Sequence, residues 1–481
     1  MVFNSLEFAA FFLLVFALYH ALGHRAQNAL LLGASYVFYG AWDWRFGGLI
    51  ALSTVVDYTV GLKLAATDDD ARRKRWLMAS VATNLGILGT FKYAGFFADS
   101  LAELAAVGGL DLPRVTTEIV LPVGISFYTF QTLSYTIDIY RRQLQPTRRF
   151  IDFALFVAFF PQLVAGPIER ASRLLPQVLA PRRLTAAGFG SGCWLILRGL
   201  FKKVVLADNL APLVDRVFES GADVTGLEVL FGVYAFAWQI YGDFSGYSDM
   251  ARGLSRLLGF ELMLNFELPY LATSPRDFWR RWHISLSTWL RDYLYVPLGG
   301  NRGGGAFVVR NLMLTMLLGG LWHGAAWTFV VWGLYQGLLL VAHRSIEPAL
   351  ERIAPAGAFG ARLWWGLRVV VMFHLACAGW LIFRAESFAD LARLVGALTG
   401  SVMGQVTASV SEPGLAPAWL PVLAVLIVPV LLFQLVQHAR RDPEALLSAP
   451  LLVRTCVYVV VFESIVLLGE DFGAPFIYFQ F

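Results

Sequence analysis

Residues 312–342 read LMLTMLLGGLWHGAAWTFVVWGLYQGLLLVA, which is 31 consecutive residues without Asp, Glu, Lys or Arg. A single helix of this length would reach about 46 Å, whereas the hydrocarbon core of a bilayer is about 30 Å thick. The glycines within 319–324 therefore predict a break between two membrane helices. His323 lies at this break, 13 residues after Arg310 and 21 before Arg344, so we expect its imidazole deep in the membrane.

The whole chain has the composition of a polytopic membrane protein. Of its 481 residues, 57% are hydrophobic and only 15% are charged, against about 25% charged in soluble domains. The first apolar run, 6–22, has no basic leader before it, so we interpret it as a retained span rather than a cleaved signal. Further apolar runs cover 28–41, 46–66, 76–98, 119–137, 186–197, 226–242, 363–383, 416–436 and 451–468. The sequence predicts an all-α protein with about 10–12 transmembrane helices.

Net charge and cysteine usage exclude several classes of protein. A net charge of +4 is too balanced for a nucleic-acid-binding protein. Cys193, Cys377 and Cys456 are isolated thiols without a CxxC spacing, so neither a disulfide framework nor a zinc site is indicated. We therefore expect no bound metal.

Basic residues in the short loops predict the orientation of the first five spans. One side carries nine of them: Arg25, four at 72–75 and four at 141–149. The other side carries two, Arg45 and Arg114. This asymmetry predicts that the amino terminus lies outside and that the arginine-rich loops are cytosolic.

Two later apolar segments are too short or too interrupted to span a bilayer. The segment 151–165 contains Pro161, and 260–271 contains Glu261 and Glu267. Non-helical backbone survives at membrane depth only where protein or a water-filled cavity satisfies it. We expect these segments to be re-entrant or interfacial, around a cavity.

The stretch 274–302, SPRDFWRRWHISLSTWLRDYLYVPLGGNR, carries basic and aromatic residues at helical spacing. Its apolar residues from Trp279 to Tyr293 form one stripe, which predicts an amphipathic helix in the membrane interface. His283 is then expected to point toward the membrane interior or a cavity mouth. The alternative is a surface helix with an incidental histidine.

Other candidate residues carry weaker signals. His374 lies in an apolar run but only six residues from Arg368. Tyr241, Asp243 and Ser245 begin a polar cluster behind an apolar span, where either a cavity or local capping requires them. A structural histidine bonded to a neighbouring carbonyl is likewise the alternative for His323.

Six segments together resemble the membrane-bound O-acyltransferase family, in particular its bacterial alginate O-acetylation branch. They are LPVGISFYTFQTLSY from Leu121, FFPQLVAGPIER from Phe159, YGDFSGYSDMARG from Tyr241, FWRRWHISLSTWLRDYLYVPLGGNR from Phe278, GGLWHGAAWTFVVWG from Gly319 and the terminal PFIYFQF. The resemblance implies an essential intramembrane histidine, which maps onto His323, and a second histidine, which maps onto His283. It also implies one membrane-embedded domain over 1–481, a ring of helices around a central tunnel.

Within that domain we expect peripheral helices over 1–118, a catalytic core over 119–345 and carboxy-terminal helices over 346–481. Candidate tunnel residues are Trp322, Trp282, Tyr241, Asp243, Ser245 and His374.

The resemblance further implies an acetyl donor in the cytosol, such as acetyl-coenzyme A, and no tightly bound cofactor. The acceptor would be an extracytoplasmic polysaccharide, reached with a periplasmic acetyltransferase partner and a secretion complex at the inner membrane. The donor's phosphates require cations, and spacing suggests Arg276, Arg280, Arg281, Arg291 and Arg302.

Acyl transfer needs a base for the attacking hydroxyl, and an imidazole suits that task near neutral pH. We therefore assign His323 as general base, because the chain contains no GxSxG elbow. One alternative is a channel or secondary transporter in which His323 relays protons. Another is a membrane scaffold for a secretion complex, in which both histidines are dispensable.

Overall fold

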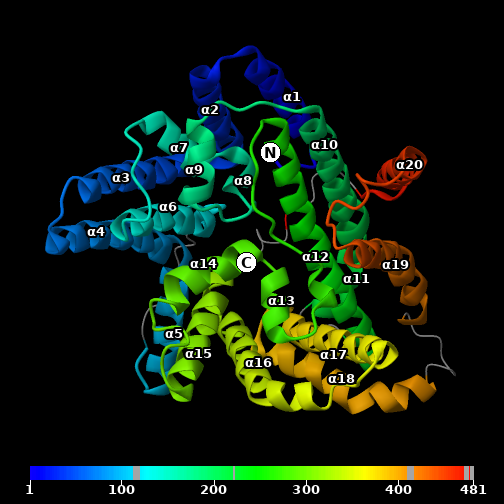
Figure 1. The fold of residues 1–481 in the computed structure, drawn as a ribbon. Helices are drawn as coiled ribbons and strands as arrows, with labels where there is room; N and C mark the ends of the chain where they lie inside the picture. Colours follow the sequence, from blue (N-terminus) through cyan, green and yellow to red (C-terminus); the bar gives the residue numbers. More distant parts are fainter. Residues whose placement is uncertain (112–119, 220, 222, 409–415, 471–475, 477–481) are drawn as a thin grey trace. The chain divides into compact units, whose positions relative to one another are not determined.

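The computed structural model describes residues 1–111, 120–219, 221, 223–408, 416–470 and 476. The regular structure within these residues is helical throughout (Figure 1), which confirms the predicted all-α class. Their internal contacts define two compact units. The first unit comprises 1–196 and 248–263, and the second comprises the described residues of 197–247 and 264–480.

Six stretches of the described residues are long and apolar enough to cross a bilayer, as in a multi-pass membrane protein. They are His24–Ala65, Gly305–His323, Trp327–Arg352, Ala358–Arg384, Ala418–Arg440 and Leu451–Leu468. The longest of them holds two helices that are joined by a short 3₁₀ turn, η1 (Trp44–Phe46).

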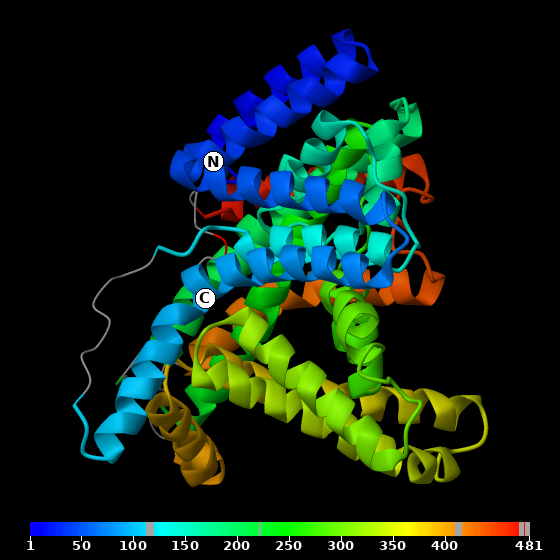
Figure 2. The same cartoon turned by 90° about the vertical axis from the view of Figure 1, so that its left-hand side faces the viewer.

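The first unit begins with six helices. They are α1 (Leu6–Ala21), α2 (His24–Asp43), α3 (Gly47–Ala65), α4 (Asp70–Leu88), which continues through η2 (Gly89–Tyr93) into α5 (Ala94–Val107), and α6 (Ile125–Tyr140). Helices α3, α4 and α6 lie side by side (Figures 1 and 2). Buried Arg73 ties their ends together, because its guanidinium donates to the carbonyls of Leu64, Ile139 and Tyr140.

The segment predicted to be re-entrant forms short buried helices. These are α7 (Phe150–Ala158), α8 (Phe160–Leu163) and α9 (Ala171–Leu179), followed by α10 (Ala186–Leu200). Every residue from 152 to 169 is buried. Protein therefore surrounds this interrupted segment, and its re-entrant or interfacial place in the membrane stays a prediction.

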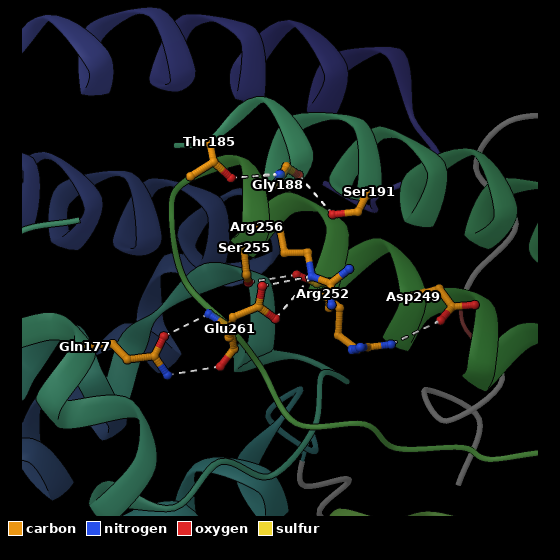
Figure 3. Close-up of polar contacts among 10 residues, drawn as sticks. Gln177, Thr185, Gly188, Ser191, Asp249, Arg252, Ser255, Arg256 and Glu261 are labelled. Atoms are coloured by element: carbon orange, nitrogen blue, oxygen red, sulfur yellow. Dashed lines mark hydrogen bonds and ion pairs between the residues drawn. The ribbon is translucent and has the colours of Figure 1, made fainter. Parts of the chain in front are cut away.

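The long helix α12 (Gly226–Leu257) leads into the second predicted interruption. Figure 3 shows how the first part of this non-helical segment is held in the first unit. The Glu261 N–H donates to Gln177 Oε1 over 2.8 Å, and Gln177 Nε2 donates to the Glu261 carbonyl over 3.0 Å. Arg256 pairs with the Glu261 carboxylate at 3.0 Å. A side-chain amide thus replaces the backbone partner that this non-helical segment lacks.

The second unit contains the remaining helices. They are η3 (Phe201–Ala207), α11 (Asp208–Phe218), η4 (Pro269–Leu271), α13 (Pro275–Arg281), α14 (Ile284–Leu290), η5 (Arg291–Tyr295), α15 (Gly305–His323), α16 (Trp327–Arg352), α17 (Ala358–Arg384), α18 (Phe388–Ala408), α19 (Ala416–Arg440) and α20 (Leu451–Leu468).

Helices α15 and α16 form a hairpin. The first helix ends at His323, as the glycines of this region predicted. The hairpin packs backbone against backbone. A Cβ on Gly320 would overlap the Phe329 carbonyl, and one on Gly333 would overlap the Met316 carbonyl. Small residues allow such close approach between membrane helices.

Replacing Gly320 by alanine is expected to destabilise the protein by about 1–3 kcal/mol, because the hairpin must open to admit the methyl group. Gly366 in α17 is the matched control, since a Cβ there meets nothing within 4 Å. Thermal unfolding of the purified protein in detergent measures the difference. Equal melting temperatures for Gly320→Ala and Gly366→Ala would contradict the close packing.

Candidate active site

The stretch predicted as one amphipathic helix is in fact two helices, so that prediction was wrong. Helix α13 ends at Arg281, α14 begins at Ile284, and His283 between them has a left-handed backbone with φ of 44°. The cause lies in another segment: the Ile284 N–H donates to the Asn265 carbonyl over 2.9 Å instead of continuing the helix. A left-handed conformation costs a non-glycine residue about 1–2 kcal/mol, which this bond offsets.

Asn265 also fixes the imidazole of His283. Its Oδ1 lies 3.1 Å from His283 Nδ1 and accepts from the Ser285 hydroxyl over 2.9 Å. Because an amide oxygen only accepts, Nδ1 carries the hydrogen and Nε2 keeps its lone pair. Burial lowers the pKa of His283 to about 3, so this ring is neutral at physiological pH.

His323 is the last residue of α15, and rings from three helices surround it. Trp322 of α15, Trp332 of α16 and Phe383 of α17 contact its ring edge-on at centroid distances of 5.0, 5.1 and 5.4 Å. The side chain is 5% exposed. The carboxy-terminal end of a helix carries partial negative charge, so this position stabilises a positive imidazolium.

The two histidines, 40 residues apart in the chain, meet in the second unit. Their ring centroids are 6.4 Å apart, and Trp322 contacts both rings, at 5.9 Å from His283 and 5.0 Å from His323. Phe244 covers another edge of His283 at 4.7 Å. We call His283 and His323 the histidine pair; it occupies a buried site lined by aromatic rings.

Two further tunnel candidates, Trp282 and Tyr241, lie near this site. Buried Trp282 packs on Trp380 at 4.7 Å. Buried Tyr241 contacts Phe266 at 6.1 Å, and Phe266 in turn contacts His283.

The remaining candidates have different neighbours. Asp243 forms a buried ion pair with Lys203 at 2.9 Å, and Ser245 is buried two residues further along α12. His374 is exposed and bonds to the Tyr234 hydroxyl at 2.8 Å. Of the terminal PFIYFQF motif, the described residue is Phe476, which contacts Phe244 at 5.6 Å.

A cavity of about 810 Å³ opens between α13, α14, η5, α15 and α16 in the same unit. We call it the arginine pocket. Its lining comprises Arg276, Trp279, Arg280, Ile284, Ser287, Thr288, Leu290, Arg291, Tyr295, Asn301, Leu312, Thr315, Met316, Leu340, His343, Arg344 and Glu347. Its volume is within the range of small-molecule and cofactor sites.

Three of the five arginines suggested by spacing line this pocket, and two lie elsewhere. Arg281 pairs with Asp277 at 2.8 Å, and Arg302 is exposed outside the lining. Sequence reasoning missed Arg344. It lies four residues, or about one helical turn, after Leu340 in α16, and both residues line the pocket. The described residues contain no group of three His, Cys, Asp or Glu that could hold a metal.

The arginine pocket adjoins the histidine pair through two residues of its wall. Ile284 directly follows His283 in the chain. Trp279 contacts Trp332 at 5.8 Å, and Trp332 contacts His323. The rings of Trp279 and Trp332 thus connect the pocket to His323, and Ile284 connects it to His283.

Comparison with known proteins gives a consistent answer. The family model described as MBOAT, membrane-bound O-acyltransferase family, matches residues 141–382. A probable alginate O-acetylase of Pseudomonas putida is 42% identical over the full length of both chains. One from Pseudomonas aeruginosa is 48% identical over 80% of this chain and 72% of its own.

A peptidoglycan O-acetyltransferase of Helicobacter pylori is 35% identical over 83% of this chain and 80% of its own. The histidine pair, the hairpin and the arginine pocket all lie within the residues that the family model matches. The chain belongs to the membrane-bound O-acyltransferase family and is an acyltransferase of the bacterial O-acetylation kind.

Proposed function

We propose that this enzyme takes an acetyl group from acetyl-coenzyme A in the arginine pocket and passes it, at the histidine pair, toward an extracytoplasmic polysaccharide. The observation that carries the proposal is the nearness of the two sites: the wall of the cation-lined cavity includes Ile284, which follows His283 in the chain, and Trp279, whose neighbour Trp332 contacts His323. Neither feature alone would indicate a thioester donor.

The wall of the arginine pocket suits the donor's chemistry. Arg276, Arg280, Arg291 and Arg344 supply planar guanidinium groups, which bind phosphates bidentately. Trp279 and Tyr295 offer flat faces for a base. The indole N–H of Trp279 is buried and has no hydrogen-bond acceptor among the described residues, so a ligand amide carbonyl could satisfy it.

His323 serves as the general base in this mechanism. Its imidazole takes the hydrogen of the acceptor hydroxyl while that oxygen attacks the thioester carbonyl. The carbon–sulfur bond then breaks, and the imidazolium returns the proton to the departing thiolate. The end of α15 stabilises the imidazolium by up to about 2 kcal/mol, and the surrounding aromatic rings exclude water that would hydrolyse the thioester.

We assign His283 a different role because burial lowers the pKa of its imidazole to about 3. The hydrogen on Nδ1 is engaged with Asn265, which leaves Nε2 as a fixed acceptor. We propose that His283 orients the acceptor hydroxyl or the donor and does not take the proton itself.

The identity of the acceptor rests on the relatives. Their names specify alginate and peptidoglycan, which are both extracytoplasmic polysaccharides. The higher identity to the alginate enzymes favours an alginate-type polymer. We propose a periplasmic acetyltransferase and a polysaccharide-secretion complex as partners in the bacterial inner membrane.

A channel or secondary transporter that uses His323 as a proton relay is the competing function. Purified protein given acetyl-labelled acetyl-coenzyme A distinguishes the two. An acyltransferase releases coenzyme A and transfers the label, whereas a transporter moves solute and leaves the thioester intact.

Replacing His323 by alanine is expected to lower polymer acetylation by about 10²–10⁴-fold, because the reaction loses its base. His374→Ala is the matched control, since His374 also lies in an apolar helix but is exposed and bonds to Tyr234. Acetyl content of the secreted polymer, normalised to membrane protein, is the measurement. Near-normal acetylation in His323→Ala would refute the assignment.

Replacing Arg280 by alanine is expected to weaken acetyl-coenzyme A binding about tenfold, since one charge-assisted phosphate contact is lost. The turnover number should change little, because the histidine pair is intact. Arg302→Ala is the control, as Arg302 lies outside the pocket. The proposed donor site would be wrong if titration calorimetry gave the same Kd for wild type and Arg280→Ala.

Contacts at the ends of α3 and α6 bring two arginine-rich segments, the first turns of α4 and the loop after α6, to one face of the first unit. Arg142 pairs with Asp68 at 3.2 Å, and the Tyr58 hydroxyl donates to the Arg148 carbonyl over 2.7 Å. The loop before α3, with Arg45, is at the other end of that helix. We propose that the face with more arginines is cytosolic and that the amino terminus lies outside.

Cysteine labelling in intact cells tests this orientation. In a chain whose three cysteines are replaced by serine, Gln145→Cys should resist a membrane-impermeant thiol reagent until the membrane is permeabilised. Trp44→Cys, which replaces a residue that is 78% exposed, should react in both conditions. Arg114, the other basic residue predicted outside, lies beyond the described residues. Reversed labelling would contradict the orientation.

A further inference from the structure

Two hydrogen-bond donors near the histidine pair have no acceptor among the residues that the structure describes. The indole N–H of Trp332 is buried and unpartnered. The side chain of Gln336, one helical turn further along α16, is 3% exposed and makes no hydrogen bond within the described part of the chain. Leaving a buried donor without an acceptor is costly. An acceptor that a ligand brings would satisfy both groups.

The position of Gly379 in α17 shows that the two donors meet at one place. Helices α16 and α17 lie side by side (Figure 1). A Cβ built on Gly379 would be 2.7 Å from Gln336 Nε2 and 3.6 Å from Trp332 Nε1. The two nitrogen atoms are therefore no more than about 6 Å apart, so both can donate to one oxygen atom between them. We call Trp332 Nε1 and Gln336 Nε2 the amide–indole pair.

The amide–indole pair lies between the histidine pair and the arginine pocket along α16. At one end, the ring of Trp332 contacts the ring of His323 at a centroid distance of 5.1 Å. At the other end, Leu340 follows Gln336 by four residues and lines the arginine pocket. Residues 332, 336, 340, 343 and 347 are three or four apart and so share one face of the helix. A molecule that extends along this face from the pocket to His323 passes the amide–indole pair.

The surroundings of the amide–indole pair select a neutral acceptor. The atoms nearest to a Cβ on Gly379 belong to the neutral side chains of Gln336, Tyr335 and Trp332. An anionic group buried among them would be uncompensated, which is costly. A carbonyl oxygen is neutral, and its two lone pairs can accept from both N–H groups.

The proposed acyl donor has a carbonyl at the required place. Coenzyme A carries two amide groups in the arm that joins its phosphates to its sulfur. The amide nearer to the sulfur is separated from it by two methylene carbons, and its carbonyl oxygen is thus one helical turn, or about 5 Å, from the thioester. Gln336 is likewise one turn from Trp332, the residue that contacts His323.

We propose that Gln336 and the Trp332 indole bind the amide carbonyl nearest to the donor's thioester and thereby hold the thioester at His323. This inference rests on the proposed function, because it takes acetyl-coenzyme A as the donor. Trp279, on the wall of the arginine pocket, contacts Trp332 at 5.8 Å and also has an unpartnered indole N–H, which suits the other amide. The enzyme thus recognises the arm of the donor as well as its phosphates.

Three acetyl thioesters of decreasing size test the proposal on the purified protein in detergent. Acetyl-coenzyme A carries the phosphates and both amides, S-acetyl-N-acetylcysteamine carries only the amide nearest to the sulfur, and S-propyl thioacetate carries neither. Release of the free thiol gives kcat/KM for each. We expect Gln336→Leu to lower kcat/KM about tenfold for the first two thioesters and to leave the third unchanged, because the third has no amide carbonyl to lose.

Trp332→Phe is the second variant, and it keeps the test decisive if Gln336→Leu does not fold. Phenylalanine keeps an aromatic ring beside His323 but has no N–H, so we expect the same dependence on the amide. Gln434→Leu is the matched control. Gln434 is a glutamine of the apolar helix α19 that is 2% exposed and whose amide atoms also lack partners among the described residues, but α19 contributes nothing to the lining of the arginine pocket. This control should keep the wild-type kcat/KM for all three thioesters.

Equal losses for all three thioesters in Gln336→Leu would overturn the proposal, since the residue would then not recognise the amide. Unchanged values for all three would overturn it as well. Arg280→Ala should lower kcat/KM for acetyl-coenzyme A alone, because the two smaller thioesters have no phosphates. A wild-type protein that releases no thiol from acetyl-coenzyme A would instead refute the proposed function, and this inference with it.

Discussion

The hydrogen bonds that Asn265 makes with His283 and Ile284 are the interaction on which the candidate active site depends. The backbone carbonyl of Asn265 ends one short helix and starts another, and its side chain fixes the imidazole between them. Without these bonds a continuous helix from α13 to α14 would be favoured. The ring of His283 would then leave the position in which Trp322 joins it to His323.

Positive charge decreases from the arginine pocket to the histidine pair. Guanidinium groups occupy the pocket, where a ligand with several phosphates can neutralise them. Beyond Trp279 lie the rings of Trp332 and His323. Under the proposed function, the pocket binds a charged donor while its uncharged acetyl end lies among buried aromatic rings, which suits thioester chemistry better than ion transport.

The sequence predicted features that follow from local patterns and missed those that need distant partners. An uninterrupted apolar run with glycines at its centre was enough to predict the break between α15 and α16 at His323. Helical periodicity failed at His283, because the bond that breaks the helix comes from Asn265, 18 residues away. Arg344 was missed because its helix meets α13 only in the folded unit. Gln336 was overlooked as one amide in an apolar run.

The central claim is that the histidine pair works as one unit, with His323 as the base and His283 as the positioning group. A double-mutant cycle on purified protein tests it most directly, with release of coenzyme A from acetyl-coenzyme A as the readout for His283→Ala, His323→Ala and the combined variant. Groups that act as a unit give non-additive losses. We predict that the double variant is no slower than His323→Ala alone. Rate losses that multiply would show two independent contributions and contradict the account.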